Sequence, residues 1–456
     1  ASNYRHVYSD PPRAENCFSA LQLATATGDH NYIKGSAKFF SLSARGGGGP
    51  LYVIPYNATG KLPTSYPTIA VGAGNTLDTD WNPFNDNMVA VACDNAVVKL
   101  FVIPSEFDDG LKERITEPAQ TLSGHAKPVT LLRWHPTAAN VLASASKDLT
   151  IKIWDVEAGV DKISLSGFDG LVQDMDWNYN GSQIAVSSKD KQLRIFDARS
   201  GEVLQSCQPH EGMKCFKLVW LGDTGKLITC GFTKQSKRVI KFWNSTDLSA
   251  PFHTLELDQG SGVMMPFYDE DSKVLFIAGK GDGNIRYFEI VDEAPYCYAL
   301  SEYRTSVSQK GVAILPKRAC SPLKCEITRL LKLTNSSTVE PLSFIVPRKS
   351  EAFHDDLYPD ARSGEASLNA TEWFDGANAD PKRMSMDPAK NGGKTSAASS
   401  FTAATPPPKR TVGGAGAGSA PTEFEGKDAA TLFAELVAAR KRIAELEAEV
   451  AALKGE

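Results

Sequence analysis

The stretch from Gly124 to Asp155 decides the fold of this chain. It begins with Gly124-His125, passes through Trp134, continues as Ser144-Ala145-Ser146-Lys147-Asp148 and ends as Ile151-Lys152-Ile153-Trp154-Asp155. Short apolar runs separated by polar turns predict strands, because no helical period links them. The stretch therefore predicts one compact unit of several short strands.

Related units recur along the first 350 residues. A tryptophan opens the matching context at Trp81, Trp134, Trp177 and Trp220, with spacings of 53, 43 and 43 residues. Each is followed by an apolar strand, a polar turn and a strand that ends in an aromatic-containing element. Those elements are Leu100-Phe101, Ile153-Trp154-Asp155, Ile195-Phe196-Asp197 and Phe242-Trp243-Asn244, with a further one at Tyr287-Phe288-Glu289. A period in the forties with several strands per unit is typical of β-propeller blades.

The opening stretch resembles the WD repeat. In that family a histidine, a strand serine or threonine, a turn aspartate and a tryptophan form a buried hydrogen-bond chain. The resemblance assigns these roles to His125, Ser144 or Ser146, Asp148 and Trp154. Imidazole and hydroxyl groups can satisfy a buried aspartate, which favours a structural role over a catalytic dyad. Similar turn aspartates are Asp94, Asp190 and Asp282. The other repeats are predicted to lack the histidine.

Seven units can be counted. Four are centred on the tryptophans, a fifth lies at Met264–Ile290, and degenerate units lie at Phe39–Pro55 and Val312–Val346. Seven blades of about 45 residues need roughly 315 residues, which this part of the chain can hold. An open ring would leave strand edges unpaired, so we expect the segment around Tyr4–Tyr8 to pair with the last blade. The glycine run Gly46–Gly49 lacks the following Lys-Ser/Thr of a phosphate loop and predicts a hairpin turn.

Composition excludes several classes of function. The 456 residues carry a net charge of −5, which argues against a nucleic-acid partner recognised by bulk basicity. None of the eight cysteines forms a Cys-x-x-Cys pair, so a zinc ribbon or thioredoxin motif is not expected. No apolar stretch approaches the roughly 18 residues of a membrane helix, and no signal peptide is expected. We predict neither an enzyme nor a bound metal or cofactor, because no nucleophile–base pair, metal cluster or phosphate loop has usable spacing.

The most specific motifs lie in the later part of the chain. Val346-Pro347-Arg348-Lys349-Ser350 leads through Phe353 to Asp355-Asp356-Leu357-Tyr358-Pro359. Further segments in the same order are Tyr4–Tyr8, Gly311–Arg318, Cys325–Arg329, Glu372–Phe374 and Asn378–Pro381. Together they resemble the coronins, the actin-associated WD-repeat proteins, over residues 4 to about 382.

This resemblance implies an all-β fold: a seven-bladed WD-repeat β-propeller over residues 1–346 with a C-terminal extension over 347–387 packed on its base. It implies binding to F-actin, coupling to an Arp-type actin-branching complex and to cofilin, and a place in the cytoplasm at the actin cytoskeleton of the cell cortex. The alternative is a generic WD-repeat scaffold or adaptor in trafficking or ubiquitin ligation. That alternative explains the blades but not the motif at 347–359. Large side chains predicted to anchor the extension are Phe353, Leu357, Tyr358, Trp373 and Phe374.

Charge is concentrated near the end of the predicted propeller. Residues 310–349 hold eight basic and two acidic residues, a net of +6, whereas 351–390 have a net of −5. Actin filaments are acidic, so the basic stretch would steer an encounter with them. The alternative is that these charges pair with one another along the propeller base. The candidate filament contacts are Arg5, Arg13, Lys34, Lys38, Lys317, Arg318, Arg348 and Lys349.

One position departs from the family pattern. Animal coronins commonly carry a basic residue five positions after the N-terminal cysteine, where it is implicated in filament binding. Here Cys17 is followed at that offset by Gln22, which keeps hydrogen bonds but loses the charge. Either filaments bind more weakly at this point, or the candidate contacts among the first 40 residues compensate.

The C-terminal part has a different composition. Over 391–421, 25 of 31 residues are Gly, Ala, Ser, Thr or Pro, which predicts a flexible, disordered linker over 388–427. Residues 428–456 then predict a short α-helical coiled coil, because apolar residues fall at every a and d position of nearly four heptads. The pairs Glu435–Arg440, Arg442–Glu447 and Glu449–Lys454 are opposite in sign at g and e′.

The oligomeric state of this coiled coil is predicted from competing signals. The run from Arg442 to Glu447 matches the coronin trimerisation pattern, so we favour a homotrimer. β-Branched a residues with leucine at d favour dimers, and the alanines in the seam would allow four chains. The predicted oligomerisation residues are Leu432, Leu436, Arg442, Ile443, Leu446, Glu447, Val450 and Leu453.

Overall fold

A computed structural model describes residues 2–25, 29–72 and 74–393. The predicted coiled coil and most of the predicted linker lie outside the described residues. A short helix, α2 (Pro388–Asn391), occupies the predicted start of the linker.

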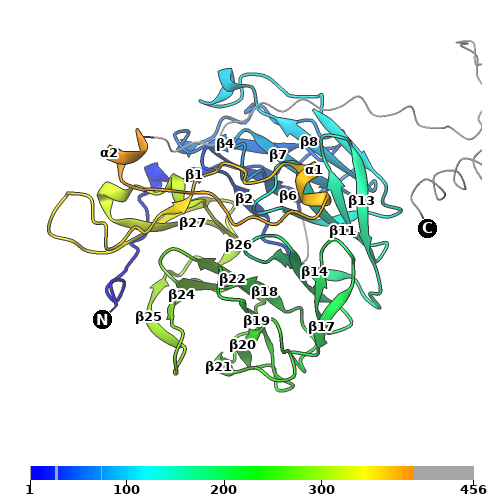
Figure 1. Ribbon diagram of the computed structural model, residues 1–456. Helices are drawn as coiled ribbons and strands as arrows, with labels where there is room; N and C mark the ends of the chain where they lie inside the picture. Colours follow the sequence, from blue (N-terminus) through cyan, green and yellow to red (C-terminus); the bar gives the residue numbers. More distant parts are fainter. Residues whose placement is uncertain (1, 26–28, 73, 394–456) are drawn as a thin grey trace, which may run out of the picture. The chain divides into compact units, whose positions relative to one another are not determined.

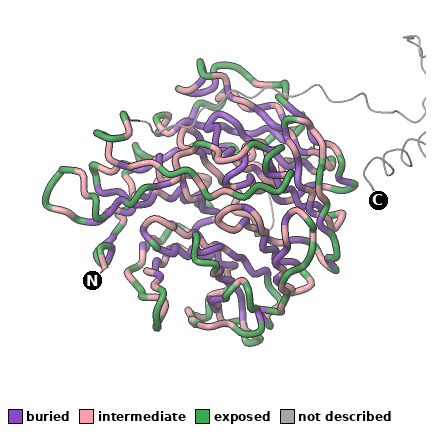
Figure 2. Tube along the Cα trace, in the orientation of Figure 1, coloured by how far each residue is buried: buried purple, intermediate pink, exposed green. Residues whose placement is uncertain are grey.

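Seven antiparallel sheets surround a central channel and form the blades of a propeller (Figure 1). The predicted seven-bladed all-β fold is confirmed. In each blade the first strand lies at the channel and later strands lie further out. Buried residues follow the strands, whereas exposed residues gather in the connecting loops (Figure 2).

Successive blades take their strands from successive stretches of the chain. Blade 1 holds β2 (Ile33–Gly35), β3 (Phe39–Ser43) and β4 (Leu51–Pro55), and blade 2 holds β6 (Thr76–Trp81), β7 (Met88–Cys93), β8 (Val97–Val102) and β9 (Gln120–Ser123). Blade 3 holds β10 (Val129–Trp134), β11 (Val141–Ser146), β12 (Ile151–Asp155) and β13 (Val160–Leu165). Blade 4 holds β14 (Val172–Trp177), β15 (Gln183–Ser188), β16 (Leu193–Asp197) and β17 (Val203–Cys207). Blade 5 holds β18 (Lys217–Trp220), β19 (Lys226–Phe232), β20 (Arg238–Asn244) and β21 (His253–Asp258). Blade 6 holds β22 (Met264–Asp269), β23 (Val274–Gly279), β24 (Asn284–Ile290) and β25 (Cys297–Arg304), and blade 7 holds β26 (Gln309–Ile314), β27 (Glu326–Thr334) and β28 (Val339–Ile345).

The N-terminal segment closes the ring. Strand β1 (Phe18–Ser19) pairs antiparallel with β28, with Phe18 opposite Val339, and so supplies the outer strand of blade 7. A short strand β5 (Gly60–Lys61) adds to β1 in parallel. Tyr8 forms a separate antiparallel bridge with Ile345. The predicted pairing of the Tyr4–Tyr8 segment with the last blade is confirmed at Tyr8, although β1 completes the sheet.

The recurring tryptophans join each blade to the one before it. The indole N–H of Trp134 donates to the carbonyl oxygen of Asp80 at 3.0 Å, and that of Trp220 donates to Asp176 at 3.1 Å. Trp177 bonds in the same way to Arg133 at 3.3 Å. The tryptophan period visible in the sequence therefore marks contacts between blades.

Aspartates on the innermost strands add a second junction between blades. In blades 2 and 4, two carboxylates of the innermost strand accept backbone N–H groups from the innermost strand of the next blade. The bonds are Leu132 N–Asp78 (2.9 Å), Trp134 N–Asp80 (2.9 Å), Leu218 N–Asp174 (3.0 Å) and Trp220 N–Asp176 (3.1 Å). They satisfy N–H groups that face the channel and have no partner strand on that side.

The loops divide into two faces. The upper face carries the loops between the second and third strands of each blade and the loops that lead from one blade to the next. The lower face carries the loops between first and second and between third and fourth strands.

Residues 347–393 form an extension that crosses the lower face (Figure 1). It contains a small hairpin of β29 (Ala361–Arg362) and β30 (Arg383–Met384), and the helix α1 (Ala370–Phe374). Leu357 and Tyr358 are buried in the core of blades 6 and 7, whereas Trp373 is buried among residues of blades 3 and 4. The extension is therefore anchored on opposite sides of the ring.

Candidate interaction surface

A chain of hydrogen bonds joins the four side chains of the WD-type unit. Nδ1 of His125 lies 2.9 Å from Oδ2 of Asp148, and Nε2 lies 2.8 Å from the Ser144 hydroxyl. That hydroxyl accepts the indole N–H of Trp154 at 2.8 Å. Ser146 is not in the chain, because its hydroxyl donates to the backbone of Lys127.

The electrostatics of this chain fit a structural role. Burial lowers the pKa of His125 and so favours the neutral imidazole. Burial raises the pKa of Asp148, but hydrogen bonds from Thr150, the Ala126 N–H and His125 outweigh it and lower the pKa to about 2. The His125 side chain is only 1% exposed, so no substrate can reach it.

A second histidine chain lies in blade 5, so the prediction that other repeats lack the histidine is wrong. Nε2 of His210 lies 2.8 Å from the Thr229 hydroxyl, which accepts the Trp243 indole N–H at 3.0 Å. The missed signal is Pro209-His210 in place of Gly-His. No aspartate follows in the 233–237 turn, and Nδ1 of His210 is buried without a hydrogen-bond partner among the described residues.

The two faces of blades 3 to 6 carry opposite charge. The upper-face loops hold eight lysines and five acids, a net of +3, whereas the lower-face loops hold eight acids, one arginine and one lysine, a net of −6. The lysines are Lys127, Lys147, Lys189, Lys191, Lys214, Lys234, Lys237 and Lys280. The acids of the lower face are Glu157, Glu202, Asp223, Asp247, Glu270, Asp271, Asp292 and Glu293.

Most upper-face acids are held by partners within the propeller. Asp190 binds Arg194 at 2.8 Å, Asp282 binds Arg238 at 2.6 Å, and Asp148 belongs to the histidine chain. The remaining acids are Asp169 and Glu211. Five of the eight lysines are exposed, namely Lys127, Lys147, Lys189, Lys214 and Lys234. The upper face therefore presents positive charge to solvent.

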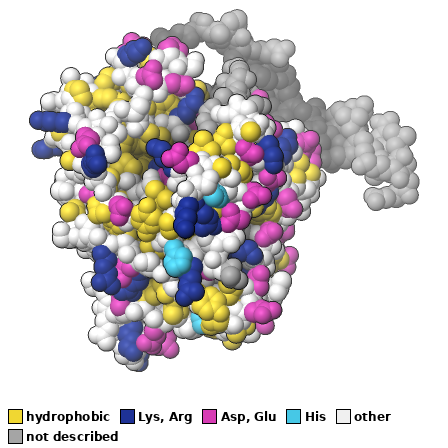
Figure 3. Space-filling view, turned by 90° about the vertical axis from the view of Figure 1, so that its left-hand side faces the viewer, with side chains coloured by type: hydrophobic (Ala, Val, Ile, Leu, Met, Phe, Trp, Pro, Cys, Tyr) yellow, Lys and Arg dark blue, Asp and Glu magenta, His cyan; other side chains and the backbone are white. Residues whose placement is uncertain are grey.

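Apolar groups accompany this charge. Met213 is 86% exposed in the loop that leads into blade 5, next to Lys214, and Leu171 and Val307 are each 36% exposed in other blade-to-blade loops. Exposed apolar side chains within a charged surface are typical of protein interaction sites. By contrast, the side of the ring near the N-terminal segment mixes basic, acidic and apolar groups (Figure 3).

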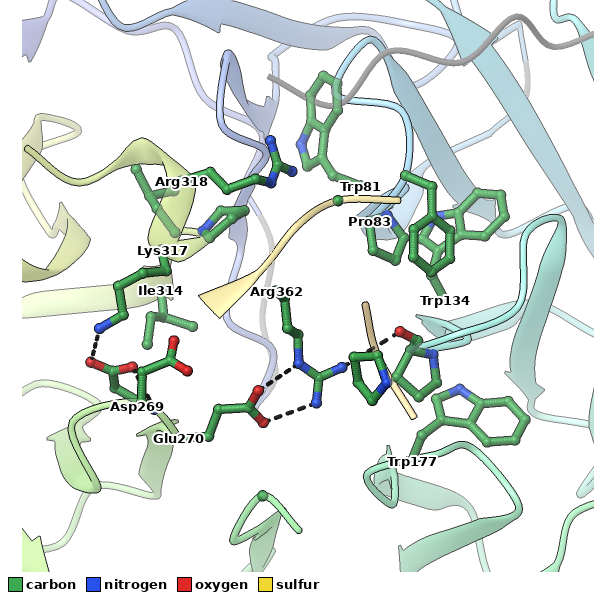
Figure 4. Close-up of a pocket in the computed structure, with 18 of the residues that line it drawn as sticks. Trp81, Pro83, Trp134, Trp177, Asp269, Glu270, Ile314, Lys317, Arg318 and Arg362 are labelled. Carbon is green, nitrogen blue, oxygen red and sulfur yellow. Dashed lines mark hydrogen bonds and ion pairs between the residues drawn. The ribbon is translucent and has the colours of Figure 1, made fainter. Parts of the chain in front are cut away.

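Lys317 and Arg318, two candidate filament contacts, lie at the lower mouth of the channel. Arg318 binds Asp86 at 2.8 Å, and Lys317 binds Asp269 (Figure 4). The Arg318 side chain is only 3% exposed, and the Lys317 side chain is only 9% exposed. A filament would not meet these charges, so the alternative of paired charges along the base describes this part of the 310–349 stretch.

The other candidate contacts lie on several surfaces. Lys34 faces the channel 3.8 Å from Asp80, and Lys38 binds Asp108 at 2.7 Å. Arg348 binds Asp356 at 2.6 Å. The exposed candidates are Arg5, Arg13 and Lys349. The structure thus does not gather the eight residues into one patch.

Gln22 lies beside two arginines that the sequence did not single out. The Arg45 N–H donates to the Gln22 carbonyl at 2.8 Å. Gln22, Arg45 and Arg114 line one groove of about 750 Å³, whose lining contains no acidic residue. These positions are separated by up to 92 residues in the chain, so only the folded blades reveal their proximity.

The extension covers the lower mouth of the channel. Arg362 binds Glu270 through two bonds of 2.8 and 2.9 Å (Figure 4). Arg383 adds bonds to Glu270 at 3.3 Å and to Asp271 at 2.9 Å. A cavity of about 440 Å³ remains beneath the extension, lined in part by Trp81 and the other repeat tryptophans. Two lower-face acids are therefore used to hold the extension.

The described residues contain no cluster of three or more His, Cys, Asp or Glu residues placed to hold a metal ion. Within the same part of the chain, no helix is long and apolar enough to cross a membrane.

Four family models match parts of the chain. Their descriptions are a type of WD40 repeat (residues 339–381), a WD domain, G-beta repeat (116–155), the WD40 domain of anaphase-promoting complex subunit 4 (160–230) and a domain of unknown function, DUF1899 (1–61). The WD matches at 116–155 and 160–230 run from the outer strand of blade 2 into blade 5.

Curated relatives match most of the chain. It is 40% identical to Coronin-like protein crn1 of Schizosaccharomyces pombe over 85% of this chain, but it spans only 64% of that protein. It is 38% identical to human Coronin-2A, covering 85% of this chain and 74% of the relative. It is 40% identical to Coronin-A of Dictyostelium discoideum, covering 85% of both chains.

Solved structures also match most of the chain. The WD40 domain of Toxoplasma gondii coronin matches with a TM-score of 0.79 and 31% identity, over 84% of this chain and 98% of that one. A chain of the mitotic checkpoint complex matches with a TM-score of 0.55 and 18% identity, over 76% of this chain and 96% of that one, which supports the propeller fold alone.

Proposed function

The chain belongs to the coronin family, and on that premise we propose that it is an F-actin-binding protein that regulates the organisation and turnover of actin filaments. It acts in the cytoplasm, at the actin cytoskeleton of the cell cortex, as a binding protein rather than an enzyme. The observation that carries the proposal is the segregation of charge between the two faces of blades 3 to 6.

The filament contact is the upper face. Actin filaments are acidic, and a face with net positive charge and exposed lysines accelerates encounter with an acidic surface. The exposed Met213 adds a contact that excludes water once the surfaces meet. The groove that contains Gln22, Arg45 and Arg114 offers a second basic contact beside blade 1. There Arg45 and Arg114 supply the charge that Gln22 lacks.

Oligomerisation strengthens this binding. Each propeller binds weakly, and a coiled coil at 428–456, preferably a trimer, links several propellers through linkers of about 40 residues. Such linkers span roughly 35 Å as random coils, so linked propellers reach neighbouring filament subunits and can bundle filaments. Coupling to an Arp-type branching complex and to cofilin belongs to the same proposal.

Co-sedimentation with actin filaments tests the contact surface. The triple variant Lys127→Glu/Lys189→Glu/Lys234→Glu should bind at least about tenfold more weakly than the wild type. The matched control is Lys162→Glu/Lys324→Glu/Lys382→Glu, which changes the total charge equally at exposed lysines of an outer strand, a lower-face loop of blade 7 and the extension. Equal losses in both variants would contradict the upper face as the contact.

The same assay tests avidity and the alternative function. A chain that ends at Asp387 should pellet with lower apparent affinity than the full chain. Equal affinities would contradict the avidity proposal. No pelleting by the wild type, together with a stable partner other than actin, would favour the generic WD-repeat scaffold or adaptor.

A further inference from the structure

A groove on blade 1 exists because this blade has three strands where most others have four. Two connecting segments cover its outer strand β4: Leu51 pairs with Ile69 of the first, and Ile69 forms a parallel bridge with Ile115 of the second. The groove, of about 750 Å³, is lined by residues 64–68 of the first segment, by Arg114 of the second and by the turn between β3 and β4. Parts of the chain that are distant in sequence therefore meet at one groove.

The backbone holds the two arginines of this groove in place. The N–H of Arg45 donates to the Gln22 carbonyl at 2.8 Å. Arg114 directly precedes Ile115, whose carbonyl accepts the N–H of Ala70 at 2.7 Å. The walls are thus part of the folded blade, so a ligand would not have to order them on binding.

The charge of both arginines is uncompensated within the described part of the chain. Arg45 and Arg114 are exposed, and neither guanidinium forms an ion pair or a hydrogen bond with a described residue. The groove lining contains no acidic residue, and the acids nearest to Arg114 in sequence, Glu113 and Glu117, are not part of it. Two guanidinium groups therefore line the groove without a carboxylate beside them, and guanidinium is the side-chain group best suited to bind phosphoryl oxygens.

Neutral donors accompany the two arginines. The hydroxyls of Thr64, Ser65 and Thr68 form no hydrogen bond with a described residue, and the backbone N–H groups of Gly46 and Gly47 form none with a described carbonyl. The space beside Gly47 is open, because a methyl group placed there would meet no atom within 4 Å. Guanidinium, hydroxyl and backbone N–H groups together are the donors with which proteins hold a phosphoryl group.

The rest of the lining is apolar and aromatic. Pro50 and Pro67 line the groove together with Tyr52 and Tyr66, whose ring centroids lie 6.3 Å apart. Burial raises the pKa of Tyr66, so its phenol stays neutral and does not repel an anion. A free phosphate ion would fill only a small part of this groove, whereas an extended peptide can place its neighbouring residues on the apolar surface.

We propose that this groove binds a phosphorylated serine or threonine in an extended segment of a partner protein. Arg45 and Arg114 bind the phosphoryl oxygens, the hydroxyls and the glycine N–H groups add neutral hydrogen bonds, and the tyrosines and prolines contact the flanking residues. The inference goes beyond the proposed function: the phosphopeptide is a second ligand of a groove whose charge also serves filament binding, and its binding needs no filament.

A peptide library tests the proposal on the full chain. The probe is a fluorescently labelled library with degenerate positions around a fixed phosphoserine, and its binding is measured by anisotropy. The phosphoserine library should bind at least about tenfold more tightly than the same library with serine, and more tightly than the library with glutamate. Equal binding of the phosphoserine and serine libraries, or of the phosphoserine and glutamate libraries, would overturn a phosphoryl site.

Substitution of the arginines locates the binding. Arg45→Ala/Arg114→Ala should bind the phosphoserine library at least about tenfold more weakly than the wild type does. The matched control is Arg13→Ala/Arg304→Ala, which removes the same charge at side chains that are 83% and 77% exposed and do not line the groove. Equal losses in the two variants would overturn the groove as the site. Thermal melting checks that both variants remain folded.

Two milder variants separate geometry from charge. Arg45→Lys/Arg114→Lys keeps the charge but loses the planar fork, so its affinity should lie between those of the wild type and the alanine variant. Gly47→Ala leaves the fold intact, because the methyl group meets no atom, but it narrows the approach to the backbone N–H groups. It should weaken binding by about threefold. Wild-type affinity in both variants would contradict the assigned contacts.

Competition identifies the source of the phosphoryl group. Unlabelled phosphoserine library should displace the probe at concentrations at least about tenfold lower than inorganic phosphate requires, because only the peptide contacts the apolar lining. Displacement by inorganic phosphate at equal concentration would overturn a peptide receptor. Stronger displacement by vesicles that contain phosphoinositides would assign the groove to a lipid headgroup and overturn the proposal as well.

The groove and the filament function can fail separately. Phosphopeptide binding without filament pelleting would contradict the filament function and leave the groove proposal standing. Filament pelleting by a chain that does not distinguish the phosphoserine and serine libraries would overturn the groove proposal and leave the filament function standing.

Discussion

The upper and lower faces of the propeller are built from the same strands but use their charges differently. On the lower face, Glu270 and Asp271 bind arginines of the extension, and Trp373 is buried between blades 3 and 4. On the upper face, five lysines in the loops of blades 3 to 6 are exposed. Charge on one face holds the molecule together, whereas charge on the other is available to a partner.

The largest effect is expected where the lower face is held by an aromatic anchor. Trp373 is fully buried, with its ring centroid 4.8 Å from that of His135 and 5.9 Å from that of Trp177. Trp373→Ala should lower the free energy of unfolding by about 3–5 kcal/mol, measured by urea denaturation. Trp373→Phe should cost less. A loss below about 1 kcal/mol for the alanine variant would show that the extension adds little to the propeller.

A smaller effect is expected where an arginine of the extension binds an acidic residue of the lower face. Arg362→Ala leaves Glu270 without its paired bonds and should lower the free energy of unfolding by about 2 kcal/mol. Hydrogen exchange at Arg383 and Met384 should rise, because β29 and β30 pair with each other. The control is Arg348→Ala, whose partner Asp356 is 45% exposed, with an expected change of at most about 1 kcal/mol. Similar changes in both variants would show that the Arg362–Glu270 pair stabilises the protein no more than an exposed ion pair does.

On the upper face, substitutions are expected to weaken binding and to leave stability nearly unchanged. Lys127→Glu/Lys189→Glu/Lys234→Glu should weaken filament binding by about tenfold, or about 1.4 kcal/mol, and change the free energy of unfolding by no more than about 0.5 kcal/mol. Raising the salt concentration from 0.05 to 0.3 M should weaken wild-type binding more than that of the variant, since salt screens exposed charges. Pelleting at both salt concentrations and urea denaturation provide the measurements. A clear loss of stability would mean that these lysines also hold the fold.

The smallest effect is expected in the channel between the faces. Burial raises the pKa of Asp176 to about 6, above its ordinary value, so the folded state binds this proton more tightly than the unfolded state. The resulting stability is present at low pH and is lost as pH rises through 6. Between pH 7.5 and pH 5, the wild type should therefore gain about 1 kcal/mol relative to Asp176→Asn. Parallel pH profiles in urea denaturation would show that Asp176 has an ordinary pKa.

The sequence predicted the blades because their signal is periodic. Each repeat tryptophan bonds to the preceding blade, so the same residue is needed at the same place in successive units. The second histidine chain was missed because proline replaces glycine before His210 and no aspartate follows it.

The charged surface could not be predicted by summing charges over a continuous stretch of sequence. The stretch 310–349 has a net charge of +6, yet Arg318 binds Asp86, 232 residues away, and Lys317 binds Asp269, 48 residues away. The lysines of the upper face come from loops spread over about 150 residues and carry no common motif. Only the closure of the ring places them on one side.

That closure also imposes an order on synthesis. Phe18 is made 321 residues before its partner Val339. At 5–20 residues per second, the first strand waits roughly 15–65 s for the blade that it completes. During that time six blades can collapse in sequence while both edges of the growing ring stay unpaired. A nascent chain arrested before blade 7 should therefore bind chaperones that recognise open strands, and release should coincide with translation of β28.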